Sequence, residues 1–404
     1  MLPVEPGAAG VHTRGVRVLF ASTAGAGHFH PLKPFVEACL RQGDDVLVAG
    51  PPALADSVAG AGYAYWRFDE PPPDELGEVW SRVATVSADE ANVIVIRDIF
   101  GRLDATASLP RLRQGCEEWR PDIVVRETSE YGSAIAADLS GIPHVRVGIG
   151  LASLEELALG IVAETLDELR RSVGLAADPG AEALRRSPYL TMVPASLEDP
   201  AALEAPTTLR FHDPAVDALP DDLPRWWAAD DAPLVYVTFG SVAGGMEMTA
   251  PVYRLALEAV ADLDVRVLFT VGHDADLERF GAAAPNVHIE RWVPQGDVLA
   301  HADAVVCHGG SGSTLGALAA GVPIVVMPLF ADQPLNARRI VATGAGISVA
   351  PPDAAALRAA VLAVLDDSTY RRAAARLASE MHALPATDVA VESLAAIARS
   401  STAD

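Results

Sequence analysis

Cysteine is scarce in this chain. Its 404 residues include only Cys39, Cys116 and Cys307, which lie far apart in the sequence. Their spacing matches no metal-ligand motif and offers no plausible disulfide framework. We therefore expect three reduced core residues in a cytoplasmic protein.

Positive charge is also scarce. The chain has 30 Lys and Arg against 54 Asp and Glu, which gives a formal net charge of −24. This imbalance argues against nucleic acid or an anionic membrane as a partner. It does not exclude a small phosphate ligand, because backbone N–H groups can bind one whatever the net charge.

Long apolar runs are missing as well. No stretch reaches the length of a membrane span, and residues 1–15 lack the basic start and apolar core of a signal peptide. We expect no membrane insertion. Half of the residues are hydrophobic, which is ample for burial, and a chain of this length favours two domains.

Short apolar runs alternate with helical patterns in both halves of the chain. The clearest runs cover residues 16–22, 45–50, 123–125, 145–149, 234–239, 265–271, 304–307 and 324–327. This alternation predicts an α/β protein with parallel, doubly wound sheets. Two such halves, each with glycine-rich turns, predict two Rossmann-like domains facing each other across a cleft.

The predicted domain boundaries follow a change in composition. Prolines and acidic residues cluster over residues 194–233, and periodicity fades there. We place an N-terminal domain over residues 1–205, a linker over 206–232, a second domain over 233–380 and a C-terminal helix over 381–404.

A glycine-rich turn near residue 310 is the strongest local signal. It follows an apolar run, and Ser313 is a favourable N-cap for a helix that continues to Ala319. Such a turn presents free N–H groups and the positive end of the helix dipole, which suits a phosphate. His308 and Thr314 add side-chain donors at the same place.

A second polar pair, Asp332 and Gln333, follows the next apolar run. In a parallel sheet both turns lie at the same carboxyl edge. The sequence therefore predicts a phosphate site beside a hydrogen-bonding pair, which suits a sugar joined to a diphosphate.

The first glycine loop begins like a dinucleotide fingerprint but has His30 where the third glycine belongs. The second strand ends at Gly50 rather than at an acid that could hold a ribose, so an NAD-dependent oxidoreductase is disfavoured. His28 lies at the mouth of the first strand, where a neutral imidazole could take a proton from an acceptor hydroxyl. Glu127, after a neighbouring strand, could orient it. His30 is the alternative base.

Acidic pairs resembling a metal motif occur at residues 262–264 and 274–276, in ordinary helix-end or loop contexts. We interpret them as solvated acids. No other His, Asp and Glu cluster has metal-ligand spacing, so we predict no metal site.

These motifs together resemble the family 1 glycosyltransferases of the two-domain GT-B fold, in particular bacterial enzymes that decorate natural products such as macrolides, enediynes and aromatic polyketides. The resemblance covers essentially the whole chain. The matching segments are Gly27-His28-x-x-Pro31, Phe239-Gly240-Ser241, Trp292-Val293-Pro294-Gln295, His308-Gly309-Gly310, Ser313-Thr314, Gly321-Val322-Pro323, Pro328 and Asp332-Gln333. It implies a final helix that packs back on the first domain.

The resemblance also implies a role for each matched residue. Trp292 would stack on the pyrimidine, while Val293 and Gln295 would place the nucleoside. Asp332 and Gln333 would bind sugar hydroxyls, and His28, oriented by Glu127, would activate the acceptor. The residues expected around the diphosphate are Gly240, Ser241, His308, Gly310, Ser311, Gly312, Ser313 and Thr314.

One departure from the family bears on the donor. Plant members carry a glutamate that binds both ribose hydroxyls, and Gly316 occupies that position here. A site without this acid has less reason to prefer ribose, which favours a dTDP-sugar over a UDP-sugar.

The implied reaction is an inverting, metal-independent transfer of a (deoxy)sugar from a dTDP- or UDP-sugar to a hydroxyl of a hydrophobic aglycone in antibiotic biosynthesis. The nucleotide-sugar is a co-substrate, and no cofactor is expected. Two alternatives on the same fold stay open: a nucleotide-sugar 2-epimerase, which needs no acceptor, and a non-catalytic nucleotide-sugar-binding partner protein. A homodimer is also open.

Overall fold

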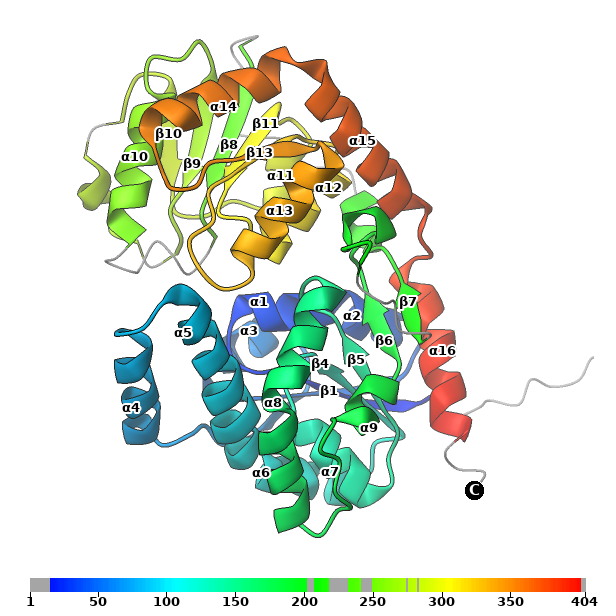
Figure 1. The fold of residues 1–404 in the computed structure, drawn as a ribbon. Coiled ribbons are helices and arrows are strands. Elements are labelled where there is room, and N and C mark those ends of the chain that lie inside the picture. Colours follow the sequence, from blue (N-terminus) through cyan, green and yellow to red (C-terminus); the bar gives the residue numbers. More distant parts are fainter. Residues whose placement is uncertain are drawn as a thin grey trace, which may run out of the picture.

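Two parallel sheets organise the protein. The computed structural model describes residues 15–201, 207–217, 232–240, 249–273, 275–281 and 283–400. Seven strands form one sheet and six form the other, and both are flanked by helices (Figure 1). This architecture confirms the predicted α/β class and its two Rossmann-like halves.

The first sheet has the order β3-β2-β1-β4-β5-β6-β7, with every pair parallel. Its central strands are buried on both faces by helices, which explains their nearly unbroken apolar sequences. The strands are β1 (Arg17–Ala21), β2 (Asp45–Gly50), β3 (Tyr65–Arg67), β4 (Ile123–Glu127), β5 (His144–Val147), β6 (Tyr189–Thr191) and β7 (Thr208–Arg210).

The helices of this half cover both faces of the sheet. They are α1 (Ala26–Phe29), η1 (His30–Leu32), α2 (Lys33–Arg41), η2 (Pro52–Leu54), α3 (Ala55–Gly60), α4 (Pro73–Val83), α5 (Ala88–Ile94), η3 (Val95–Asp104), α6 (Ala105–Trp119), α7 (Gly132–Ser140), α8 (Ala152–Ser172), α9 (Glu182–Arg186), η4 (Ala195–Leu197) and η5 (Pro214–Asp217).

The second sheet has the order β10-β9-β8-β11-β12-β13 and is also parallel. Its strands are β8 (Leu234–Thr238), β9 (Arg266–Thr270), β10 (Val287–Glu290), β11 (Ala304–Cys307), β12 (Ile324–Val326) and β13 (Gly346–Ser348). Its helices are α10 (Ala250–Val260), η9 (Leu277–Phe280), α11 (Gln295–Leu299), α12 (Ser311–Ala319), α13 (Gln333–Thr343), α14 (Ala354–Asp366) and α15 (Ser368–Ala383).

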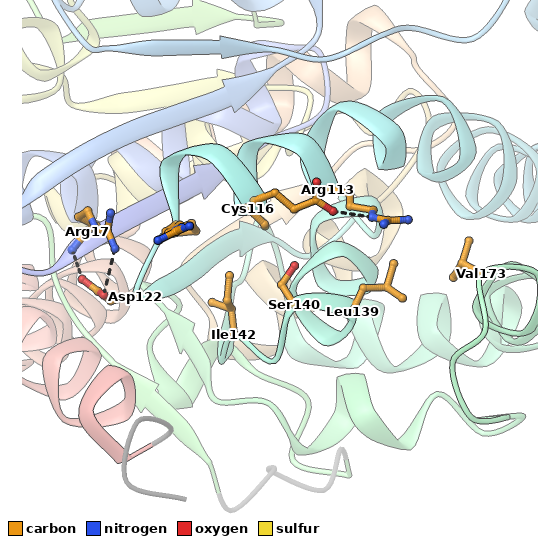
Figure 2. Close-up of a pocket in the computed structure, with 11 residues that line it drawn as sticks. Arg17, Arg113, Cys116, Asp122, Leu139, Ser140, Ile142 and Val173 are labelled. Carbon is orange, nitrogen blue, oxygen red and sulfur yellow. Dashed lines mark hydrogen bonds and ion pairs between the residues drawn. The ribbon is translucent and has the colours of Figure 1, made fainter.

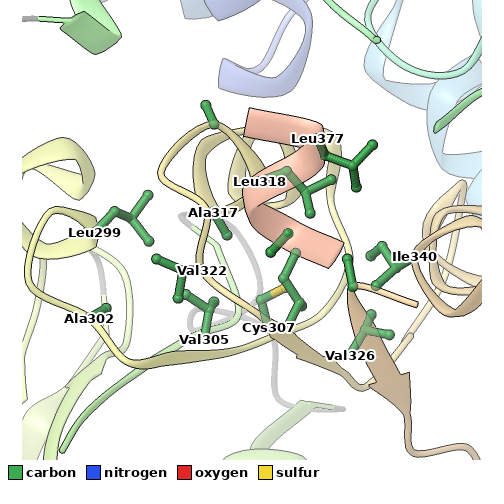
Figure 3. Packing of buried hydrophobic residues seen from close by; sticks show 14 of the residues in the cluster. Leu299, Ala302, Val305, Cys307, Ala317, Leu318, Val322, Val326, Ile340 and Leu377 are labelled. Carbon is green, nitrogen blue, oxygen red and sulfur yellow. The ribbon is translucent and has the colours of Figure 1, made fainter. Parts of the chain in front are cut away.

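Apolar packing fixes the strand that leads into the glycine-rich turn. Cys307, at the end of β11, is fully buried and lies in one cluster with Leu318 of α12, Ile340 of α13 and Leu377 of α15 (Figure 3). The cluster therefore holds α12, α13 and β11 together directly beneath the predicted donor site. All three cysteines are free and buried, as predicted.

The last helix, α16 (Thr387–Ser400), returns to the first domain. Arg41 of α2 makes two hydrogen bonds to the Asp388 carboxylate, at 3.0 Å and 2.9 Å. Ala390 and Leu394 are buried in the core on that side of the first sheet. The predicted packing of the C-terminal helix against the first domain is confirmed (Figure 1).

Strand β7 lies within the range predicted as a linker, yet it pairs with β6 at the edge of the first sheet. Residue 206 and residues 218–231 of that range lie outside the described part of the chain, so the boundaries stay predictions. Among the described residues, no helix combines the length and apolar character that a membrane span requires.

Candidate active site

His28 sits at the carboxyl end of the first sheet, where β1 gives way to α1. The turn between them passes through Gly25, whose φ of +104° is open to glycine and strained for other residues. The turn brings Nδ1 of His28 to 3.1 Å from Oε1 of Glu127, the last residue of β4. Because β1 and β4 are parallel neighbours, both side chains emerge at the same edge.

The Glu127 carboxylate is completely buried and held at both oxygens. Oε1 accepts hydrogen bonds from the Thr23 hydroxyl at 2.8 Å and the Thr23 backbone N–H at 3.3 Å, besides its contact with His28. Oε2 accepts from the backbone N–H of Ser129 at 2.6 Å. This carboxylate therefore has a fixed orientation that in turn fixes the imidazole.

The contact between His28 and Glu127 shifts the pKa values of both residues. Burial disfavours the charged imidazole, but the Glu127 carboxylate outweighs it, so the pKa of His28 lies above its ordinary value. Burial also opposes the Glu127 charge, but His28 and the hydrogen bonds hold the pKa of Glu127 below its ordinary value. With Nδ1 directed at Glu127, Nε2 is the nitrogen left to accept a proton.

The donor turn opens helix α12 three residues earlier than predicted. Gly310 is the N-cap and the helix begins at Ser311, so the prediction of Ser313 as N-cap was wrong. Gly309, with φ +85°, sets this earlier start. No side chain caps the helix, which leaves N–H groups of the first turn available to an anion. Ser313 lies in that first turn.

His308 is enclosed between two glycines. A Cβ on Gly240 would lie 3.0 Å from its ring and one on Gly310 only 2.6 Å away. Burial lowers the pKa of His308 to about 4, so the imidazole is neutral near pH 7. Its Nδ1 has no hydrogen-bond partner within the described part of the chain. Ser241, predicted beside it, lies outside the described residues.

Asp332 closes the other side of this turn. Its Oδ2 accepts hydrogen bonds from the Ser311 hydroxyl at 3.1 Å and the Asn336 amide at 2.8 Å. Asn336 also donates to the Gly309 carbonyl at 2.8 Å. The start of α13 is thereby tied to the start of α12, and Asn336 is a contributor that the sequence motifs did not indicate.

Gln333 and Thr314 are more enclosed than their predicted ligand contacts suggest. Gln333 is 3% exposed, and its Oε1 accepts from the N–H groups of Leu329 and Phe330 at 2.8 Å and 2.9 Å. Only its amide nitrogen is left for a sugar hydroxyl. The Thr314 hydroxyl is buried and has no partner among the described residues.

Trp292 is half exposed, at 53%, and one side of its ring is covered. It stacks on His273, with ring centroids 5.3 Å apart and planes 21° from parallel. Val293 is partly buried against the core below. His273, in the turn after β9, holds the indole in place, and no motif in the sequence indicated it.

Gln295 fills the space beside Gly316. Its amide nitrogen lies 3.4 Å from the Gly312 carbonyl, and a Cβ on Gly316 would lie 2.2 Å from that nitrogen. A side chain at position 316 would therefore displace Gln295. The Gln295 amide therefore occupies the space into which a side chain at position 316 would extend.

The two domains approach each other at these residues. A Cβ on Gly150, from the first domain, would lie 3.3 Å from the Ser311 hydroxyl and 3.8 Å from the Asp332 carboxylate. Asp332 also helps to raise the pKa of His28. The Asn92 amide lies 3.4 Å from the Ala331 carbonyl. The predicted base therefore faces the predicted sugar-binding residues.

His30, the alternative base, is exposed in η1. Within the described ranges, no group of three or more His, Cys, Asp and Glu could hold a metal ion. A surface cavity of about 580 Å³ lies at the opposite edge of the first sheet, at the amino ends of β1 and β4. It is lined by residues such as Arg17, Asp122 and Ser140 (Figure 2).

Comparison with known proteins agrees with this geometry. Residues 38–224 match the N-terminal domain of the erythromycin biosynthesis protein CIII-like family, and residues 254–397 match its C-terminal domain. The chain is 31% identical to the L-demethylnoviosyl transferase of Streptomyces niveus, over 96% of this chain and 100% of that protein. It is 30% identical to the elloramycin glycosyltransferase ElmGT of Streptomyces olivaceus, over 93% and 96%.

Among solved structures, the glycosyltransferase SnogD from Streptomyces nogalater is similar along its whole length. The two chains are 26% identical, with a TM-score of 0.76 and coverage of 95% of this chain and 100% of that one. The resemblance found in the sequence is thereby confirmed, and with it the GT-B fold. The chain belongs to the erythromycin biosynthesis protein CIII-like family and is a glycosyltransferase.

Proposed function

We propose that this enzyme moves a deoxysugar from a dTDP-sugar to a hydroxyl of a hydrophobic natural-product aglycone, with inversion and without a metal ion. The observation that carries the proposal is the His28–Glu127 pair, whose nitrogen and oxygen lie 3.1 Å apart and which faces Asp332 and the open end of α12. The relatives named above are, by their names, an L-demethylnoviosyl transferase and an elloramycin glycosyltransferase.

On the acceptor side, His28 acts as the general base. Nδ1 is engaged by Glu127, so Nε2 takes the proton as the acceptor oxygen attacks the anomeric carbon. The buried carboxylate stabilises the imidazolium formed in this step. A hydrogen-bonded base at a defined position also removes much of the entropic cost of bringing the reactants together.

On the donor side, the diphosphate leaves toward the first turn of α12. Free N–H groups and the helix dipole stabilise the charge that develops there. His308 is neutral before binding, so it contributes a hydrogen bond rather than a full charge. Asp332 binds a sugar hydroxyl while Ser311 and Asn336 hold its carboxylate.

The nucleotide is assigned from Gly316 and Gln295. Without an acid at position 316, two ribose hydroxyls lack their strongest partner, and the Gln295 amide occupies the space. A deoxyribose has one hydroxyl fewer and therefore loses fewer hydrogen bonds in such a site, which supports dTDP over UDP.

Calorimetric titration with dTDP and with UDP in excess EDTA tests the proposal. We expect metal-independent binding of both, with dTDP binding more tightly. Transfer from dTDP-glucose to an aromatic alcohol should give the inverted anomer by NMR. Tighter UDP binding would remove the nucleotide assignment, while no binding of either nucleotide would contradict the donor site itself.

A further inference from the structure

A π-helical segment lies against the catalytic histidine. The chain from α5 to α6 is helical throughout, and its middle part, η3, is a π-helix of 10 residues. Long π-helical stretches are rare, and π-helical turns are frequently found at functional sites. In Figure 1 this unit runs alongside α8 in the first domain.

Packing fixes the orientation of η3. Ile99 and Leu103 are buried in a small apolar cluster with Val79 of α4. Gly101 faces α8 so closely that a Cβ would lie 2.8 Å from Val162. Only a glycine allows this approach, so the segment cannot rotate without separating from α8.

The remaining side of η3 faces His28. The Phe100 ring lies 5.3 Å from the imidazole, between centroids, with planes tilted by 54°. Asp104 follows four residues later, near the same face of a wide helical turn. Its carboxylate interacts electrostatically with His28 and Glu127, so it lies on the same side as the base.

The Asp104 carboxylate is partly buried, and no hydrogen bond to it occurs within the described ranges. By contrast, Asp98 on the same π-helix is paired with Arg82 and Arg97. A partly buried acid that lies beside the base without such a partner has free acceptor capacity near the reaction centre.

We propose that Asp104 is an acceptor-binding residue that accepts a hydrogen bond from a second hydroxyl, adjacent to the one from which His28 removes the proton. This inference rests on the proposed function and adds an acceptor class, compounds with neighbouring hydroxyls. An acceptor lacking the second hydroxyl covers the partly buried carboxylate without pairing it, which costs binding free energy.

The interaction depends on pH. Burial raises the pKa of Asp104 to about 7, with His28 opposing this shift and Glu127, Glu130 and Glu70 adding to it. Above that pH the ionised carboxylate accepts the hydrogen bond more strongly than the neutral acid does. The preference for a diol should therefore increase between about pH 6 and pH 8.

Direct binding of a matched pair of acceptors tests the proposal. The probes are 2,3-dihydroxynaphthalene and 2-naphthol, titrated by fluorescence into the dTDP-saturated enzyme. We expect wild type to bind the diol about 10-fold more tightly, the value of a hydrogen bond to a charged group. D104L should lose this preference. D104N, which preserves the side-chain size, should reduce it.

The exposed acid Asp89 on α5 provides the control, since D89N removes the same charge from this helical unit away from His28. D89N should keep the diol preference. The pKa of His28, measured by NMR, should fall in D104L and not in D89N, an effect that a purely structural role would not produce.

Two results would overturn the inference: equal binding of the two probes by wild type, or a diol preference that survives in D104L. Binding of dTDP alone, measured on the same samples, separates this failure from failure of the proposed function. If dTDP binds and no diol preference exists, only the role of Asp104 is rejected. If dTDP does not bind, the transferase site is rejected as well.

Discussion

The two domains each place a histidine at a glycine turn between a central strand and a helix, but in opposite surroundings. His28 follows β1 and has a fully buried carboxylate at 3.1 Å. His308 follows β11 and lies between Gly240 and Gly310. The local motif is similar, so the difference comes from the neighbouring strand: β4 ends in Glu127, whereas β8 leads into Gly240.

The surroundings shift the pKa values of the two imidazoles in opposite directions. Glu127 raises the pKa of His28 against the effect of burial, while burial alone lowers the pKa of His308 to about 4. The first histidine is therefore suited to accept a proton and the second to remain neutral beside a phosphate. In the proposed function, therefore, similar strand–turn–helix units supply the base in one domain and part of the anion site in the other.

Removing the base should produce the largest effect. H28A should lower kcat by about 10²- to 10⁴-fold, because general-base catalysis is lost, and leave dTDP affinity unchanged. Steady-state kinetics and calorimetry measure the two quantities. H30A, at the exposed neighbouring histidine, is the control and should retain activity. Reduced dTDP binding or loss of folding in H28A would mean that His28 is structural.

Removing the Glu127 carboxylate should reduce the pKa difference between His28 and His308. E127Q should lower kcat by about 10²-fold, since the imidazole loses both its orientation and the partner of its charged form. The acid limb of the pH–rate profile should move to lower pH, because the group that raises the pKa of His28 is gone. An unchanged acid limb would show that Glu127 does not control this titration.

Replacing His308, at the proposed donor site, should affect dTDP binding more than proton transfer. H308A should weaken dTDP binding by about 10-fold, the value of one hydrogen bond to a charged group. The acid limb of its pH–rate profile should coincide with that of wild type, because His308 titrates far below that range. A variant with wild-type affinity for dTDP would place His308 outside the diphosphate site.

The pH dependence of the wild-type enzyme separates the two histidines further. Because the base must be neutral, kcat/KM should fall about tenfold per pH unit below the pKa of His28, which lies above its ordinary value. Affinity for dTDP should not follow the titration of His308 between about pH 5 and pH 8. An acid limb well below pH 6 would contradict the raised pKa.

The smallest expected effect concerns the nucleotide. G316E should displace the Gln295 amide and shift the UDP-to-dTDP affinity ratio toward UDP by about 2- to 10-fold, the range of one added hydrogen bond. G316A, which adds only the Cβ that collides with Gln295, controls for the displacement. An unchanged ratio in G316E would remove the argument for dTDP.

Much of this comparison could be predicted from the sequence. Buried parallel strands are unbroken apolar runs, so the strand ends that carry His28, Glu127 and His308 could be located. In a parallel sheet, strand ends share one edge, and this placed His28 and Glu127 close enough to propose a pair.

The rest depended on contacts that no local pattern encodes. Helix α12 has Gly310 rather than Ser313 as its N-cap, because the preceding Gly309 adopts a conformation that the sequence permits but does not require. The Gln333 side chain points inward and accepts hydrogen bonds from the backbone N–H groups of Leu329 and Phe330. The π-helix, whose Gly101 packs closely against Val162 of α8, was not indicated by any local pattern in the sequence.

Titration of the two imidazoles by NMR tests the central comparison most directly. Histidine-labelled protein would be measured from about pH 4 to pH 9, with H28Q and H308Q supplying the assignments. The account predicts that the pKa of His28 lies above its ordinary value and that of His308 near 4. Similar values for the two, or a lower value for His28 than for His308, would contradict it.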